Sequence, residues 1–196
     1  MILKNNKFKK HSNVVCDPVN LQEGKEIASK LFIWLSRESS GVGLAAPQIG
    51  VHKRVCVVHV DKPLIFINPK IEEADGEFVY AEGCLSYPNQ LVKTNRFKEI
   101  SVSAENLDQP MVFQAGSNPR LTLECVAVQH EIDHLDGITI FDREYKPKPL
   151  RVSKKWGRNE IVGITDGKDY KDIKYKKAKP LLDSGKWVVY VGGPIT

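Results

Sequence analysis

Hydrophobic positions along this chain switch between helical and strand spacing, which predicts a structure that mixes helices and sheets. Residues 22–36 carry apolar side chains three and four positions apart, as in a helix with one buried face. Residues 54–60 and 64–68 are rich in β-branched side chains, and residues 99–106 alternate apolar with polar positions, so all three are predicted strands. Residues 41–50 contain Gly and Pro at positions that exclude a regular helix.

A second helix is predicted to follow two candidate N-caps, Asn118 and Thr122. Pro119 suits its first turn, and Gly137 suits its C-terminal cap, so we expect the helix to end near Gly137. The chain should then return to an extended form over residues 138–141.

Turn signals and prolines divide the rest of the chain. The turn signals are Asp75–Gly76, Asp166–Gly167 and Gly192–Gly193. Residues 78–91 are expected to be short, irregular chain. Pro147 and Pro149 interrupt the sequence after the second helix, and only residues 187–191 beyond them form a convincing strand. We therefore predict a main domain over residues 1–145, with an irregular or β-rich extension over residues 146–196 rather than a second globular domain.

One face of the second helix combines apolar side chains with two histidines. Leu123, Val126, Ala127, His130 and His134 occupy positions i, i+3, i+4, i+7 and i+11, which lie on one side of a helix. The face that enters the core would therefore also carry both imidazoles. Such a site would be walled by aliphatic side chains and held on a rigid element.

The residues from His130 to His134 read H-E-x-x-H. This spacing lets both histidines bind one metal ion and places Glu131 close enough to act as a general base on water. The same string also occurs in ordinary solvated helices, so the metal interpretation depends on a third ligand. The candidates are His11, His52, His59, Cys16, Cys56, Cys84 and Cys125.

Among these candidates Cys84 stands out, because Gly83 beside it allows the backbone to approach a metal closely. Cys56 lies inside an apolar strand and is expected to pack as a small hydrophobic residue. Cys125 lies on the second helix but points away from the His130 face. Three protein ligands with one water are typical of a catalytic rather than a structural metal site.

Composition indicates a soluble protein. The 196 residues are 41% hydrophobic and 27% charged, and no apolar run is long enough to span a bilayer. The basic N-terminus lacks the apolar region of a secretory signal. Four widely spaced cysteines without a C-x-x-C pair suggest reduced thiols. We expect a cytoplasmic monomer with no membrane partner; an organellar location stays open.

Charge is concentrated in the extension. Residues 146–196 contain 13 Lys and Arg against 5 Asp and Glu, a net charge of +8, whereas the other 145 residues have a net charge of −3. A basic tail on a mildly acidic body suggests contact with a polyanion such as ribosomal RNA. The alternative is a solvated basic surface without a partner.

Three short segments resemble the signature motifs of the peptide deformylase family. They are GVGLAAPQ from Gly41 to Gln48, EGCLS from Glu82 to Ser86, and QHEIDHL from Gln129 to Leu135. Their order also matches, and the resemblance extends over residues 21–143. It implies an α+β fold in which antiparallel or mixed sheets pack around a central metal-binding helix. It also implies hydrolysis of the N-formyl group from the initiator methionine of nascent chains, with release of formate.

The resemblance further implies roles for particular residues. Cys84, His130 and His134 would hold one divalent metal, Fe²⁺ in most of the family, with Zn²⁺, Ni²⁺ and Co²⁺ as alternatives. Glu131 would take a proton from the attacking water and deliver a proton to the leaving amine. Gln48 and the Leu85 backbone N–H would stabilise the oxyanion.

Substrate contacts follow from the same resemblance. The backbone of Val42, Gly43 and Leu44 would pair with the peptide as a β-strand, and Gly83 is a further expected substrate contact. The methionine side chain would enter a pocket formed by Leu123, Val126 and Ala127. Tyr87 stands where the family more often has an aliphatic residue. Glu82 is expected to pair with Arg96, and Asp133 to be structural rather than a ligand.

Two rival functions stay open at this stage. The first is a different H-E-x-x-H metallohydrolase, such as a peptidase; those rarely use a cysteine ligand. The second is a non-catalytic binding module that keeps the fold. The joint presence of Gln48, Cys84, Glu131 and both histidines argues against it.

Overall fold

The computed structural model describes residues 1–146 and 156–189, and the chain forms two compact units, Met1–Tyr145 and Lys146–Thr196. Each unit is described by itself. The elements of unit 1 are α1 (Asn6–Lys9), α2 (Leu21–Leu35), β1 (Gly43–Ala45), the 3-10 helix η1 (Ala46–Ile49), β2 (Val55–His59), β3 (Pro63–Ile67), β4 (Lys70–Cys84), β5 (Tyr87–Ser103), β6 (Met111–Gln114) and α3 (Pro119–Leu135). Those of unit 2 are β7 (Ile161–Thr165), β8 (Tyr170–Lys174), α4 (Tyr175–Asp183) and β9 (Val188–Val189).

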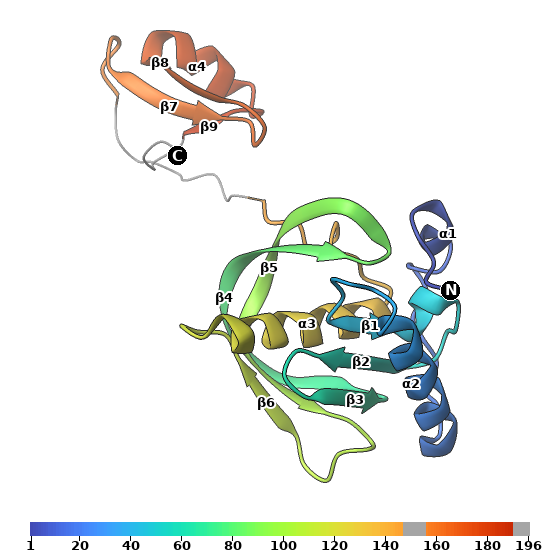
Figure 1. Cartoon of the computed structure of the whole chain (residues 1–196). Coiled ribbons are helices and arrows are strands. Elements are labelled where there is room, and N and C mark those ends of the chain that lie inside the picture. The colour runs from blue at the N-terminus through green and yellow to red at the C-terminus, as the bar shows by residue number, and fades with distance from the viewer. Residues whose placement is uncertain (147–155, 190–196) are drawn as a thin grey trace. The chain divides into compact units, whose positions relative to one another are not determined.

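Unit 1 contains two antiparallel three-stranded sheets, ordered β1-β2-β3 and β4-β5-β6. Helix α3 runs between them and contacts strands of both sheets (Figure 1). Helix α2 packs on the β1-β2-β3 sheet through the apolar face that its spacing predicts, with Ile27, Leu31 and Leu35 in the core. The predicted α+β fold with a central helix is confirmed.

The long hairpin of β4 and β5 corrects two predictions. Asp75–Gly76 is not a turn, and most of residues 78–91 is not irregular, because both segments lie in these paired strands, which reverse at 85–86. The sequence from Glu72 to Glu77 is polar and contains few strand formers, so its conformation comes from pairing with β5. The predicted strand at residues 99–106 is the end of β5 as far as Ser103, where Ile100 and Val102 are buried; residues 104–106 lie beyond the strand.

Helix α3 begins as predicted. Asn118 is the N-cap, its side chain accepts a hydrogen bond from the Arg120 N–H, and Pro119 occupies the first turn. The helix ends at Leu135, and Gly137 follows in the left-handed region with φ 75°. We expected one buried face, but every residue from Cys125 to Leu135 is buried, because sheets lie on both sides.

The segment after α3 differs from expectation. Residues 138–141 do not form an extended strand; the chain enters turns at Ile140. The Asp142 carboxylate accepts hydrogen bonds from the N–H and the hydroxyl of Thr139, which stabilises this turn.

Unit 2 is more ordered than we expected. It has a sheet ordered β8-β7-β9 and a helix, α4, with a hydrophobic cluster around Val162, Ile164 and Ala178. The helix escaped prediction because Pro180 lies inside it and lysines surround its apolar positions. Asp166–Gly167 does form the β7–β8 turn. Pro147, Pro149, Gly192–Gly193 and the end of the 187–191 strand lie outside the described residues. No helix in the described parts of the chain is long and apolar enough to cross a membrane.

Candidate active site

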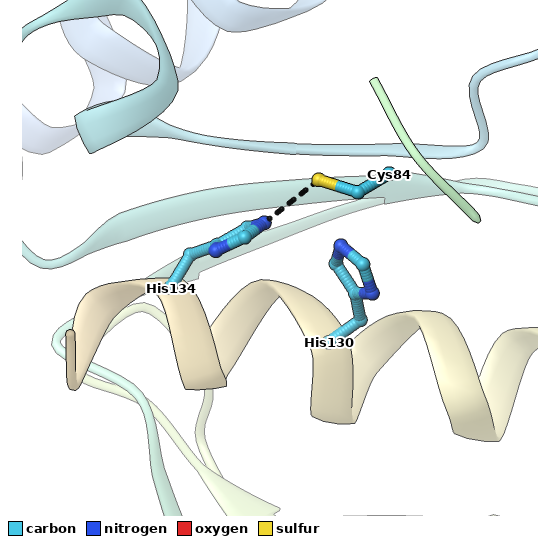
Figure 2. A group of neighbouring side chains, drawn as sticks. All are labelled: Cys84, His130 and His134. Atoms are coloured by element: carbon cyan, nitrogen blue, oxygen red, sulfur yellow. Dashed lines mark hydrogen bonds between the residues drawn. The ribbon is translucent and has the colours of Figure 1, made fainter. Parts of the chain in front are cut away.

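Three side chains, one from strand β4 and two from helix α3, converge at one point. Cys84 ends strand β4, while His130 and His134 lie one turn apart on α3 (Figure 2). Their potential ligand atoms lie within 4.8 Å of one another, and Cys84 Sγ is 3.3 Å from His134 Nε2. Among the described residues this is the single cluster of three such side chains. One thiol and two imidazoles form a donor set that suits Fe, Zn, Ni or Co.

Glu82 orients the His130 ring. Its Oε2 lies 2.8 Å from His130 Nδ1, which leaves Nε2 as the nitrogen able to bind a metal. Glu82 also accepts hydrogen bonds from the Thr94 hydroxyl and from Arg96 Nε, the latter at 2.8 Å, so the predicted Glu82–Arg96 pair is confirmed. Burial opposes ionisation of Glu82, but His130 and Arg96 together lower its pKa to about 2.

The charged network continues beneath the site through Arg96. Its Nη1 donates to Asp133 Oδ2 at 2.5 Å, and Arg143 Nη2 donates to Asp133 Oδ1 at 2.6 Å. Asp133 therefore has a structural role, as we predicted. Both carboxylates are buried and paired with guanidinium groups, which hold each in a fixed position.

Glu131 points into the same site from α3. It is 4% exposed, and its Oε2 makes no hydrogen bond to a described residue. Burial raises its pKa to about 7, a value that suits a general base near neutral pH. A Cβ atom at Gly43 would lie 2.5 Å from Glu131 Oε1, so the glycine makes room for this carboxylate.

Gln48 lies in η1 with its amide fixed at both ends. Its Oε1 accepts a hydrogen bond from the Ala45 N–H at 2.8 Å, and its Nε2 donates to the Ser86 hydroxyl at 3.2 Å. The same Nε2 lies 3.8 Å from Cys84 Sγ. The amide N–H groups are therefore directed at the segment that carries Cys84, where an oxyanion donor is expected.

A pocket of about 700 Å³ opens beside these groups. It is lined by most of the predicted substrate-binding residues: Val42, Gly43, Gly83, Leu123, Val126 and Ala127. Leu44 is the exception. Its side chain is fully buried in the core around α2, because consecutive side chains of β1 face opposite sides, so only its backbone can reach a peptide.

A family model described as "Polypeptide deformylase" matches residues 3–149 of this chain. The chain belongs to the peptide deformylase family. The match is wider than the resemblance over residues 21–143, because it includes the N-terminal segment.

Related deformylases agree with this assignment. The peptide deformylase of Heliobacterium modesticaldum is 48% identical over 110 residues, covering 56% of this chain and 70% of that protein. Among solved structures, peptide deformylase from Thermotoga maritima is similar with a TM-score of 0.63 and 30% identity, covering 74% of this chain and 97% of that one. A Met-Ala-Ser-bound class I type b deformylase from Acinetobacter baumannii gives a TM-score of 0.61 and 26% identity, covering 73% and 96%.

The chain is therefore a metal-dependent hydrolase that removes the N-formyl group from newly synthesised peptides. Membership of this family excludes both rival functions: a non-catalytic binding module, and a peptidase that shares only the H-E-x-x-H motif. The remaining cysteines lie apart from the deformylase site. Cys56 is fully buried in the core, as predicted. Cys125, expected only to be a poor ligand, is fully buried too, and burial raises both pKa values.

Several residues near the candidate site could not be found from the sequence. Tyr80 and Leu91 line the pocket from β4 and β5, and this placement depends on the hairpin we did not predict. Phe8 packs on His134, although nothing in its lysine-rich surroundings indicates a role. Tyr87 does line the pocket, but its ring also packs between Phe8 and Phe141.

Proposed function

We propose that Cys84, His130 and His134 hold the catalytic metal and that Glu131 is the general base. The observation that carries this proposal is the convergence of the three potential ligands within 4.8 Å, with a buried carboxylate from the next position of α3. Mutation of Glu131 and of Cys84 provides the direct tests, and both are argued in the Discussion.

We propose Fe²⁺ as the native metal. A thiol with two imidazoles is a borderline-soft donor set that accepts ferrous iron, but it would also accept Zn²⁺, Ni²⁺ or Co²⁺. Elemental analysis of protein purified without oxygen should find about one iron atom per chain. Zinc as the main metal in such a preparation would overturn this choice.

The residues around the site support each step of amide hydrolysis. A metal held there supplies a Lewis acid that polarises the formyl group and makes water a better nucleophile. Glu131 takes a proton from the attacking water and delivers it to the amine nitrogen as the C–N bond breaks, giving formate and a free amino terminus. The Gln48 amide and the Leu85 backbone N–H donate to the oxyanion, each such donor being typically worth about 3 kcal/mol.

The free edges of two strands support extended binding of the substrate. β1 and β4 are edge strands of their sheets, with a single strand partner each among the described residues, and Gly43 and Gly83 from these strands line the pocket. A peptide can add to such an edge through its main chain. The methionine side chain would then meet Leu123, Val126 and Ala127. The A. baumannii relative was solved with Met-Ala-Ser bound, which supports a short peptide that begins with methionine as a ligand.

Replacing Gly43 with Ala should lower kcat by on the order of 10- to 100-fold, because the new Cβ would displace the Glu131 carboxylate. Steady-state kinetics on a formyl-Met peptide measures the effect. Gly116→Ala is the matched control, since a Cβ there meets no atom within 4 Å. Equal activity of the two variants would show that Gly43 does not set the position of Glu131.

We propose that residues 146–196 bind ribosomal RNA near the nascent chain. Their net charge of +8 supports this, because phosphate contacts by Lys and Arg dominate RNA affinity. Ribosome binding should therefore fall steeply as salt rises. Truncation after Pro149 should weaken co-sedimentation with ribosomes but spare hydrolysis of short formyl peptides, because every proposed catalytic residue lies at or before His134.

The melting temperature of the truncated protein separates loss of binding from loss of stability. Within unit 2, β9 pairs with β7. Ribosome affinity that is unchanged by truncation at low salt would refute the RNA contact. We also propose that the protein is a monomer, since one chain provides every proposed catalytic residue, and sedimentation at working concentration tests this. The proposed location is the cytoplasm.

A further inference from the structure

Residues 3–8, here called the N-terminal strap, are fastened to two segments that carry proposed catalytic residues. The Leu3 N–H donates to the Gln48 carbonyl at 2.7 Å, and the Asn5 N–H donates to the Ser86 carbonyl at 2.8 Å. Gln48 is the proposed oxyanion donor, and Ser86 lies two residues after Cys84. The strap therefore ties together, by main-chain hydrogen bonds, two of the three motif segments of the site, Gly41–Gln48 and Glu82–Ser86.

The strap reaches the third segment through Phe8. This side chain is fully buried, and its ring meets the His134 ring edge to face, with centroids 5.2 Å apart and planes at 85°. The same ring lies 5.7 Å from that of Tyr87 and belongs to an apolar cluster with Cys84 and Ile140. Phe8 therefore contacts one proposed ligand directly and helps to enclose another.

The two histidines are held in different ways. A buried carboxylate, that of Glu82, fixes the plane of His130 through Nδ1, as is common for metal-binding histidines. The His134 ring has no carboxylate partner among the described residues. It packs edge to face on the rings of Phe8 and His130, and edge-to-face packing of this kind has a preferred geometry. Its polar neighbours are Cys84 Sγ, 3.3 Å from Nε2, and the Ile138 backbone. Phe8 thus restrains the plane of the His134 ring by packing, whereas Glu82 restrains that of His130 by a hydrogen bond.

We propose that Phe8 is a positioning residue that holds the His134 imidazole in the plane needed for metal binding, so that the N-terminal strap governs metal retention. The proposal rests on the ligand set proposed above. The chain beyond the strap is also anchored, since His11 Nδ1 lies 2.9 Å from His52 Nε2 and the Cys16 N–H donates to the Leu135 carbonyl at 2.9 Å. Phe8 is therefore anchored from both sides.

The test uses full-length protein loaded with Co²⁺, which reports ligand geometry through its visible absorption. Phe8→Leu removes the ring, and Phe113→Leu is the matched control. Phe113 is also a buried ring in an edge-to-face pair, 6.0 Å from Phe66, but it touches no proposed ligand. The measurements are the rate of Co²⁺ loss to excess chelator, the visible spectrum and the melting temperature.

Phe8→Leu should lose Co²⁺ about 10- to 100-fold faster than the wild type, the range typical for loss of an orienting partner, and its visible bands should shift. Phe113→Leu should melt at a lower temperature but keep the wild-type spectrum and rate. Equal rates of metal loss in the two variants would overturn the proposal. If Phe8→Leu does not fold, Phe8→Met, whose flexible side chain fills irregular gaps but has no ring, decides by the same two readouts.

The same experiment distinguishes failure of the ligand set. Wild-type protein that shows no thiolate-to-cobalt absorption would refute Cys84 as a ligand, and with it the basis of the proposed site. Wild-type protein with that absorption, together with a Phe8→Leu variant of unchanged rate and spectrum, would refute the role of Phe8 alone.

Discussion

Glu131→Gln should lower kcat for a formyl-Met peptide by about 10² to 10⁴, the usual contribution of a positioned general base, while the metal stays bound. The substitution keeps the size of the side chain and removes its ability to accept a proton. Glu131 is buried, its pKa is raised to about 7, and its Oε2 makes no hydrogen bond to a described residue. Little of the loss should therefore come from broken structural contacts.

Glu124→Gln is the matched control on the same helix. Glu124 lies almost two turns before Glu131, outside the residues that line the pocket, so its loss should leave kcat unchanged. Metal content must be measured on the same preparations. Near-normal turnover of a metal-replete Glu131→Gln protein would rule out the general-base assignment and would direct attention to another proton acceptor.

The elements that could be predicted from sequence are those whose side-chain pattern and backbone preferences agree. Helix α2 has one apolar face, and β2 and β3 are dense in β-branched residues, so each was placed within one or two residues. Helix α3 was bounded correctly because Asn118 and Gly137 are good caps. Its burial on all sides could not be predicted, since it depends on two sheets that are separate in sequence.

The β4–β5 hairpin shows the opposite case. Asp75 and Gly76 favour a turn locally, but both lie within the pairing of β4 with β5, where Asp75 pairs with Glu99. This error propagated into the site. The hairpin positions Glu82 beside His130, and it brings Tyr80 and Leu91 to the pocket, so none of these contacts could be predicted. The H-E-x-x-H spacing on α3 could be interpreted because it needs only local helix geometry.

Unit 2 shows a further limit of sequence reasoning. Tyr175, Ala178, Leu181 and Leu182 have helical spacing and pack into the cluster of unit 2, but the high lysine content and Pro180 hid this pattern. The charge of the segment could be counted directly. The side chains that form the small core of unit 2 could not be predicted, because this core joins α4 to strands that precede and follow it in sequence.

Cys84→Ser should weaken metal binding by more than about 100-fold, because loss of a partner behind a ligand already costs 10- to 100-fold. A serine hydroxyl stays protonated near neutral pH, so it cannot replace a thiolate as a charged, soft ligand. Both histidines and Glu82 would remain in place, so the residual site would have two protein donors. Metal content after dialysis, together with turnover, measures the effect.

Cys56→Ser and Cys125→Ser are the matched controls, since each buries a hydroxyl at a fully buried cysteine that is not part of the ligand cluster. Both should retain the metal. Cys56→Ser should lower the melting temperature, because a buried hydroxyl without a good partner is unfavourable. Cys125→Ser should cost less, because the Cys125 thiol already lies 3.6 Å from the Phe113 carbonyl, which a hydroxyl can use as an acceptor. This contrast separates a ligand from a packing residue in one experiment. Equal metal content in all three variants would contradict the assignment of Cys84, whatever their relative stabilities.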